Sequence, residues 1–289
     1  MEEAIQKADA LIEALPYIQD FQDKIVVIKF GGSAMQDREV FDGILEDVAF
    51  LSTVGVRPVV VHGGGSRISS EMEKQGLQPT FTHGHRVTDD KSLEVAVEVL
   101  NRTAAEIAEG IQRFGAPADN LFEDRETPVT AKKKYLLEEG EEVDIGFVGE
   151  VTSVGTGAFL SSTSAGRVPV MPPLGRDNGG QLYNINADTA AAATAVGLQA
   201  EKLVLLSDVH GIMSDPDDPD SLLSTIDEEQ AERLISEGKI QGGMLPKVRA
   251  CVDTLEGGVQ KAHIVDGHLP HSLLLEIFTR RGVGTQLIE

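Results

Sequence analysis

The chain has 289 residues, of which 41% are hydrophobic and 25% charged, as is ordinary for a globular protein with a substantial core. Asp and Glu number 47 against 25 Lys and Arg, and the net charge of −22 argues against nucleic acid and anionic membranes as partners. Cys251 is the only cysteine, no apolar run approaches ~20 residues, and no signal-peptide pattern opens the chain, so we expect a cytoplasmic protein without membrane spans.

Residues 1–22 form an arm ahead of the first predicted strand. Apolar residues recur in it at helical spacing, which predicts an amphipathic helix that Pro16 should end or kink. The helix could pack on its own domain or, because it lies outside the sheet that follows, on another subunit. The recurring residues are Ala4, Ile5, Ala8, Leu11, Ile12 and Leu15.

Residues 25–28 are four consecutive apolar, mostly β-branched residues, a pattern typical of a strand buried on both faces. Lys29 follows them, just before Gly31 and Gly32. A lysine at the end of a buried strand costs free energy unless an anion meets it, and glycines let a backbone approach that anion closely. The stretch fits a phosphate site, and it fits equally a lysine that reaches solvent.

The pattern of strand, glycine-rich turn and helix recurs at once. Residues 59–61 read as a buried strand, residues 62–66 as a glycine-rich turn, and residues 67–75 as a helix. Two such units indicate βαβ connections and a parallel sheet that binds ligands at the carboxyl ends of its strands. We interpret His62 as shaping its turn, because no metal-ligand spacing is evident around it.

The rest of the chain continues the alternation of strands and helices. Residues 82–90 read as a loop that carries Arg86, and residues 127–154 as a hairpin. Its basic run, Lys132–Lys134, fits a solvated strand or a mobile flap. Composition shifts near 175–180, where we place a lobe boundary. Further predicted elements are helices at 39–51, 92–113, 184–196 and from 244, strands at 168–171, 203–206 and 262–267, an edge strand at 285–288, and a loop at 214–221.

Motif searches exclude several enzyme classes. The P-loop, the G-x-G-x-x-G fingerprint, the protein-kinase motifs and the G-x-S-x-G elbow are all absent. The polar residues that fit together are Lys29, Arg86, Asn184, Asp188 and Lys247. Phosphoryl transfer needs positioning and positive charge more than covalent chemistry, and this set could supply both. Asp188 could cap a helix, but we favour the role of holding the two lysines.

Five motifs, in order, resemble the amino acid kinase family. The resemblance runs from about residue 1 to 289 and is strongest to members that phosphorylate N-acetyl-L-glutamate in arginine biosynthesis. It implies an α/β fold, an open three-layer αβα sandwich with a mainly parallel central sheet and an N-terminal helical arm. It also implies an oligomerisation arm (1–22), a substrate-binding lobe (23–177) and a nucleotide-binding lobe (178–289). The motifs span residues 28–32, 62–65, 84–89, 183–188 and 242–247.

The resemblance assigns roles to individual residues. Lys29 and Lys247 would stabilise the transition state, and Asp188 would orient them. ATP would bring its own Mg²⁺, and no metal site on the protein is expected. The acceptor carboxylate, with a pKa of ~4.3, is already ionised and needs no general base. The substrate would contact Gly64, Gly65, Arg86 and Asn184. The nucleotide would contact Gly31, Gly32, Asp208, Gly211, Met213, Lys239 and Gln241. His85 departs from the family, where an apolar residue usually precedes the arginine.

The arm and the tail resemble the arginine-inhibited members of the family. In those proteins the N-terminal helix interlaces dimers into a hexamer, a trimer of dimers, and arginine binds beside the helix. Tyr17, His263, Glu276 and Gly282 match that site, and a carboxylate suits a cationic effector. These residues could instead only pack the arm. Two other functions stay open: a sibling kinase that acts on acetylaminoadipate, and an arginine-sensing regulatory protein on the same fold.

Overall fold

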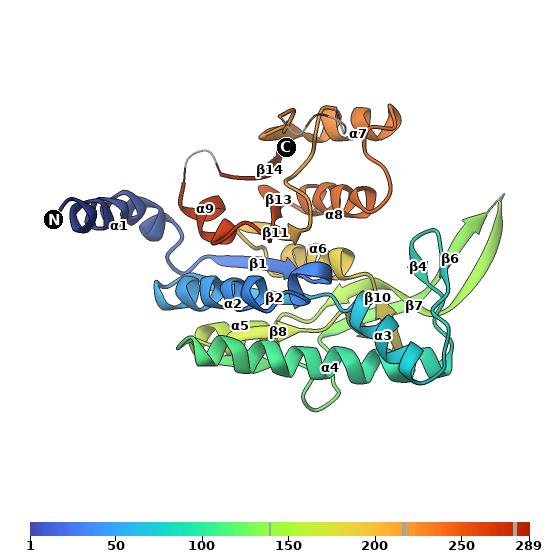
Figure 1. Ribbon diagram of the computed structural model, residues 1–289. Helices are drawn as coiled ribbons and strands as arrows, with labels where there is room; N and C mark the ends of the chain where they lie inside the picture. The colour runs from blue at the N-terminus through green and yellow to red at the C-terminus, as the bar shows by residue number, and fades with distance from the viewer. Residues whose placement is uncertain (139, 216–217, 219, 280–281) are drawn as a thin grey trace.

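A mixed, mainly parallel β-sheet forms the centre of the protein (Figure 1). The computed structural model describes residues 1–138, 140–215, 218, 220–279 and 282–289, without the side chains of residues 2–4 and 7. Among these residues, every neighbouring pair in this sheet runs parallel except β13 and β14. In spatial order the strands are β12 (Thr225–Asp227), β14 (Thr285–Ile288), β13 (Lys261–Asp266), β11 (Lys202–Ser207), β1 (Ile25–Phe30), β2 (Arg57–His62), β8 (Val168–Met171) and β5 (Ala118–Asn120).

The apolar run of β1 explains its central place. Val26 and Ile28 point into the core on one face of the sheet, and Val27 points into the core on the other, all fully buried. Helices α2, α4 and α9 cover the first face, and α5, α6 and α8 cover the second. The predicted α/β class with a mainly parallel central sheet is therefore confirmed. The helices are α1 (Glu2–Asp20), η1 (Gly32–Met35), α2 (Arg38–Thr53), α3 (Gly65–Lys74), α4 (Asp90–Arg113), α5 (Gly157–Ser164), α6 (Ala187–Gly197), α7 (Glu228–Ser236), α8 (Met244–Glu256) and α9 (Ser272–Phe278).

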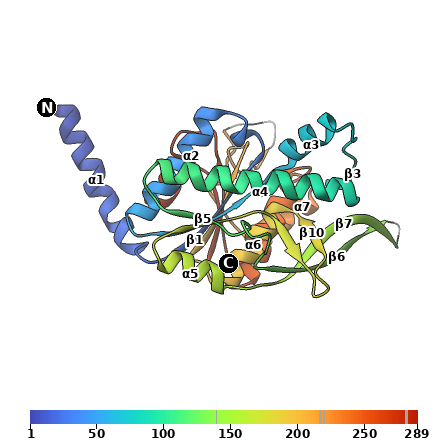
Figure 2. The ribbon, with the colours of Figure 1, turned by 90° about the horizontal axis from the view of Figure 1, so that it is seen from below.

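The predicted hairpin is present and belongs to a second sheet. Strands β6 (Val129–Glu138) and β7 (Glu141–Val154) pair antiparallel and close with β9 (Leu174–Arg176) and β10 (Leu182–Ile185) into a small barrel. The hairpin projects from the end of the molecule opposite α1 (Figure 1, Figure 2). The lobe boundary at 177 stays a prediction.

Three local predictions are wrong. The helix does not end at Pro16 but continues to Asp20, because a proline this close to a helix end removes only one hydrogen bond of the last turns, and the alternative of a kink at Pro16 stays a prediction. Residues 285–288 do not form the edge of the sheet, since β12, which we did not predict, pairs outside β14. The predicted loop at 82–90 is partly strand, because β4 (His85–Arg86) lies within it and pairs with β3 (Phe81–Thr82), which ends at the first residue of the loop. Two further predictions fall partly outside the described residues. In the predicted loop at 214–221, these are residues 216, 217 and 219, and in the apolar face predicted for the arm, the side chain of Ala4.

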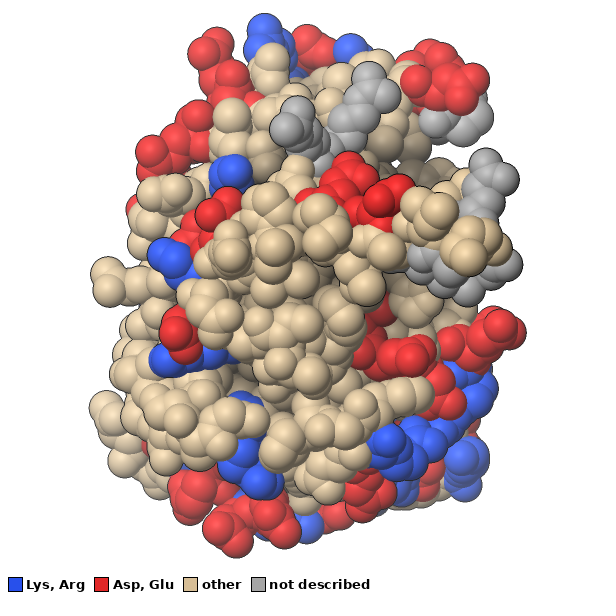
Figure 3. Space-filling view, turned by 90° about the vertical axis from the view of Figure 1, so that its left-hand side faces the viewer, with Lys and Arg blue, Asp and Glu red and all other residues tan. Residues whose placement is uncertain are grey.

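The outer part of α1 does not pack on its own domain. Ile5, Leu11, Ile12 and Leu15 are 52%, 66%, 68% and 45% exposed. On the side of the molecule from which α1 projects, charged side chains surround a broad area of other residues (Figure 3). No helix in the described part of the chain is both long enough and apolar enough to cross a membrane.

Candidate active site

Two glycine-rich loops meet at the carboxyl ends of β1 and β2. A Cβ atom on Gly31 would lie 2.9 Å from the Cα atom of Gly63, so only glycine allows the two backbones to come this close. Gly32 has φ +62°, a conformation that side chains disfavour. His62 is fully buried and donates from Nδ1 to the Gly63 carbonyl oxygen at 2.9 Å, as expected of a histidine that shapes its turn.

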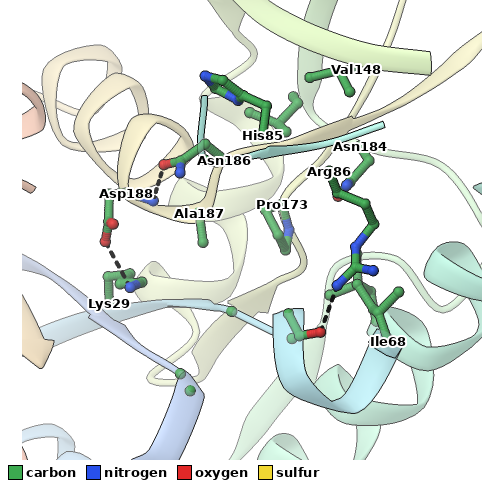
Figure 4. A pocket seen from close by; sticks show the side chains of 18 of the residues that line it. Lys29, Ile68, His85, Arg86, Val148, Pro173, Asn184, Asn186, Ala187 and Asp188 are labelled. Atoms are coloured by element: carbon green, nitrogen blue, oxygen red, sulfur yellow. Dashed lines mark hydrogen bonds and ion pairs between the residues drawn. The ribbon is translucent and has the colours of Figure 1, made fainter. Parts of the chain in front are cut away.

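Asp188 lies between the two predicted lysines. The Asp188 carboxylate, on α6, is 2.7 Å from Lys29 Nζ at the end of β1 (Figure 4). It is also 3.8 Å from Lys247 Nζ, which α8 supplies. Burial would raise the pKa of Asp188, but the two ammonium groups outweigh it and hold this pKa below its ordinary value. The helix cap belongs to Asn186, whose Oδ1 accepts from the backbone N–H groups of Asp188 and Thr189. Asp188 is thus free to pair with both lysines.

A cavity of about 230 Å³ opens beside the ion pair of Lys29 and Asp188. Lys29 and Asp188 lie on one side of it and Arg86 on the other (Figure 4). The two cationic groups thus suit a ligand with an anionic group at each end. The cavity gathers these predicted residues: Lys29, Gly31, Gly32, Gly64, Gly65, Arg86, Asn184 and Asp188.

Arg86 is buried without a carboxylate partner among the described residues. Its Nη2 donates to the carbonyl oxygen of Gly65 and to Ser69 Oγ, each at 2.8 Å, and its guanidinium lies 4.7 Å from the centre of the Phe81 ring. Burial lowers the pKa of Arg86, yet the group stays charged at neutral pH. A buried guanidinium held by neutral groups keeps its charge available for an anionic ligand.

A second cavity of about 570 Å³ lies beyond the carboxyl end of β11. Apolar side chains such as Ile212 and Met244 line it together with polar ones, a mixture that suits a nucleoside. Among the described residues, no group of three or more His, Cys, Asp and Glu could hold a metal ion. This cavity gathers all five predicted residues of the 200–241 region: Asp208, Gly211, Met213, Lys239 and Gln241.

The model of the amino acid kinase family matches residues 24–266. Acetylglutamate kinases from Symbiobacterium thermophilum and Methanocaldococcus jannaschii are 46% and 44% identical to the chain. The first alignment covers 100% of this chain and 99% of the relative, and the second covers 99% and 98%. The chain belongs to the amino acid kinase family, among the acetylglutamate kinases.

Solved structures agree with this family. The N-acetylglutamate synthase of Neisseria gonorrhoeae, complexed with coenzyme A and N-acetyl-glutamate, superposes with a TM-score of 0.84 at 29% identity. This match covers 98% of our chain but only 63% of the synthase chain. Giardia carbamate kinase, at 16% identity and a TM-score of 0.67 over 92% of this chain and 99% of its own, shares the fold.

The structure also brings together the residues predicted for an effector, on the face of the sheet that α9 covers. His263 Nδ1 donates to Glu276 Oε1 at 2.6 Å, and Glu276 Oε2 accepts from the N–H groups of Val283 and Gly284. A Cβ atom on Gly282 would collide with the Glu276 carboxylate at 2.6 Å. Tyr17 packs on the adjoining hydrophobic cluster, which includes residues of α9.

Sequence reasoning missed Lys202, the first residue of β11. Lys202 is only 6% exposed, and its Nζ lies 4.7 Å from the centre of the Phe21 ring. Burial and the charge of Lys261 lower its pKa to about 8, against the opposing effect of the Glu276 and Glu201 charges. The available signal was a lysine directly before a run of four apolar residues, the mirror image of Lys29 directly after one.

Proposed function

We propose that this chain transfers the γ-phosphoryl group of ATP to the γ-carboxylate of N-acetyl-L-glutamate, the second step of arginine biosynthesis. The observation that carries the proposal is the Lys29–Asp188–Lys247 cluster beside two touching glycine loops. Two ammonium groups, held by one carboxylate, offset the repulsion between an anionic acceptor and a phosphoryl group. Arg86, on the other side of the cavity, would bind the α-carboxylate, with Asn184 nearby.

Donor and acceptor would approach the lysines from two sides. ATP would place its nucleoside in the cavity of about 570 Å³ and its phosphates along Gly31 and Gly32, while Gly64 and Gly65 would present N–H groups to the acceptor. Mg²⁺ would be held by the nucleotide phosphates and would neutralise part of their charge. The acceptor carboxylate is ionised at neutral pH, and the protein therefore only has to orient it. The cytoplasmic location expected from the sequence remains part of this proposal.

An ADP-release assay tests this function. We expect turnover that requires N-acetyl-L-glutamate, ATP and Mg²⁺. When the two substrates are compared at equal concentration, the rate with acetylaminoadipate should be lower. A preference for acetylaminoadipate would instead identify the sibling kinase. Arginine binding without any phosphoryl transfer would identify a regulatory protein.

We further propose that arginine inhibits the enzyme by binding between α1 and α9. The Glu276 carboxylate would receive the guanidinium, because its pKa is held low by the hydrogen bonds of His263 and of the backbone despite burial. Lys202, which lacks a carboxylate partner among the described residues, would receive the α-carboxylate. A solved synthase structure at 28% identity and a TM-score of 0.82, covering 97% of this chain and 65% of its own, contains L-arginine. Tyr17 and Gly282 would complete the site.

We also propose a homo-oligomer, a hexamer built as a trimer of dimers, in which α1 packs on another subunit. Four exposed apolar residues of α1 support this assembly: Ile5, Leu11, Ile12 and Leu15. Burying such residues at an interface would stabilise it by about 1.5–3 kcal/mol for each side chain that becomes fully covered. Sedimentation measures the size of the particle.

A further inference from the structure

His85 is a lining residue of the 230 Å³ cavity that the proposed reaction does not use. Its Nε2 lies 3.3 Å from Nζ of Lys134, which β6 of the projecting hairpin supplies. An ammonium group has three hydrogens and no lone pair, so it can only donate in this contact. Nε2 of His85 is therefore the acceptor, and the proton of the neutral imidazole lies on Nδ1.

The surroundings of His85 favour this neutral form. Burial lowers its pKa, and the nearby charges of Lys134 and of His83 lower it further. His83 contacts Glu138 through an Nδ1–Oε1 distance of 3.0 Å, so β6 holds this loop at two points. The hairpin thus fixes both the position and the tautomer of His85.

The donors of Arg86 do not fill the acceptor positions of a bound carboxylate. Both hydrogens of its Nη2 are used by Gly65 and Ser69, and Nη1 lies 3.4 Å from Met72 Sδ. A ligand carboxylate has two oxygens and about four acceptor positions. No described residue forms a hydrogen bond with His85 Nδ1, whose N–H is free for such an acceptor.

We propose that His85 contacts the acceptor substrate as a hydrogen-bond donor through Nδ1, and that Lys134 is the positioning residue that fixes this tautomer. The inference rests on the acceptor of the proposed function, an acylated amino acid with two carboxylates. The polar His85–Lys134 pair stands where the resembling family has an apolar residue before the arginine. It makes acceptor binding in this chain depend on a residue of the hairpin.

Steady-state kinetics with N-acetyl-L-glutamate and ATP test the contact. We expect His85→Leu to raise the KM for N-acetyl-L-glutamate about tenfold, the effect of losing one hydrogen bond to a charged group, with kcat and the KM for ATP unchanged. Lys134→Met should raise the same KM by a smaller factor. His85→Gln should restore a low KM, because its amide accepts from Lys134 and still donates.

Lys132→Met is the matched control, since it removes the same charge from the same strand. Lys132 is 62% exposed and pairs with Glu150 at 3.4 Å, and its variant should keep the wild-type constants. An unchanged KM in His85→Leu would overturn the inference, as would a loss of kcat as large as the rise in KM. Wild-type protein that fails to phosphorylate N-acetyl-L-glutamate would contradict the proposed function as well.

The tautomer has a readout that does not depend on activity. In protein labelled with ¹⁵N-histidine, the imidazole shifts distinguish a protonated Nδ1 from a protonated Nε2, and the His85→Gln spectrum assigns the signal. We expect protonated Nδ1 in the wild type and a shift toward protonated Nε2 in Lys134→Met. Protonated Nε2 in the wild type would contradict the inference even if the enzyme is active.

Discussion

Two buried lysines lie at opposite ends of adjacent strands and are treated differently by the fold. Lys29, near the carboxyl end of β1, is 2.7 Å from the carboxylate of Asp188. Lys202 opens β11, where it pairs in register with Val26, and has no carboxylate within ion-pair distance among the described residues. A compensated charge is held in place before any ligand arrives. A buried lysine without an ion-pair partner, stabilised only by the more distant charges of Glu276 and Glu201, destabilises the folded protein, and an anionic ligand that binds it can remove this cost.

On the proposed function, this difference separates a proposed catalytic pole around Lys29 from a proposed regulatory pole around Lys202. At the catalytic pole, one carboxylate orients two ammonium groups, and the ligand meets a rigid arrangement. At the other pole, the charge of Lys202 faces the ring of Phe21, at the junction of the arm with the sheet. A ligand that pairs with Lys202 would therefore also act on the arm.

The largest effect is expected from Asp188→Asn. Loss of the shared carboxylate leaves Lys29 and Lys247 to repel each other, and we expect kcat to fall by about 10²–10³-fold, as for the loss of one preorganised electrostatic group. The same ADP-release assay measures the change. Arginine binding at the other pole, followed by calorimetry, should persist.

Lys24→Met is the control for this substitution. Lys24 lies directly before β1 and forms an exposed ion pair with Glu201 at 3.2 Å, so its loss should leave kcat unchanged. Wild-type kcat in Asp188→Asn would remove the lysine pair from the mechanism.

The second effect is expected at the regulatory pole. Lys202→Met removes the proposed partner of the effector carboxylate, and the arginine concentration for half-inhibition should rise by about tenfold or more. The kcat without arginine should stay at the wild-type value, since Lys202 lies at the far end of its strand. Lys132→Met, which removes the same charge from an exposed position on the hairpin at the other end of the molecule, is the control. Unchanged inhibition in Lys202→Met would exclude Lys202 from the effector site.

The sequence allowed us to predict the catalytic pole better than the regulatory one, for a physical reason. Lys29 follows an apolar run and precedes glycines, so local pattern alone predicts a buried strand that ends in a lysine, which faces either an anion site or solvent. Lys202 also has a local signal, a lysine directly before four apolar residues, but its meaning depends on Phe21 and Glu276, which are distant in sequence. Similarly, β12 has only three residues and no periodicity, and without it β14 was assigned to the edge.

Close contacts were equally hidden from the sequence. The two glycine motifs predicted a backbone near an anion, but not that Gly31 and Gly63 touch. Asn186 and Asp188 could each have capped α6, and only the coordinates give the cap to Asn186. The partner of His85 comes from a hairpin strand some 50 residues away, which no local pattern indicates.

A smaller effect is expected from the exposed face of α1. The double substitution Leu11→Ser/Ile12→Ser makes polar the apolar face that we propose for contact with another subunit. Sedimentation should then show a particle smaller than the wild type, and this particle should be a dimer if α1 interlaces the dimers. Inhibition by arginine should weaken by a few-fold, because the arm carries Tyr17. Deletion of residues 1–22 should shift the particle size in the same way. A wild-type particle size in both would refute the interlacing arm.

The smallest effect is a pH-dependent gain in stability in Lys202→Met. Because the pKa of Lys202 is lowered to about 8, the folded protein bears the cost of a buried charge below that pH. Between about pH 8 and 10.4 the unfolded chain binds more protons than the folded one, and wild-type stability gains in this window. Methionine keeps contact with Phe21 and carries no charge. If burying the Lys202 charge costs roughly 1–2 kcal/mol of unfolding free energy, the substitution should raise Tm at pH 7 by roughly 2–6 °C. This rise in Tm should shrink as the pH rises through 8 toward 10. Calorimetric unfolding at pH 7 and pH 10 measures this, and an equal change in Tm at both pH values would mean that the Lys202 charge is already compensated without a ligand.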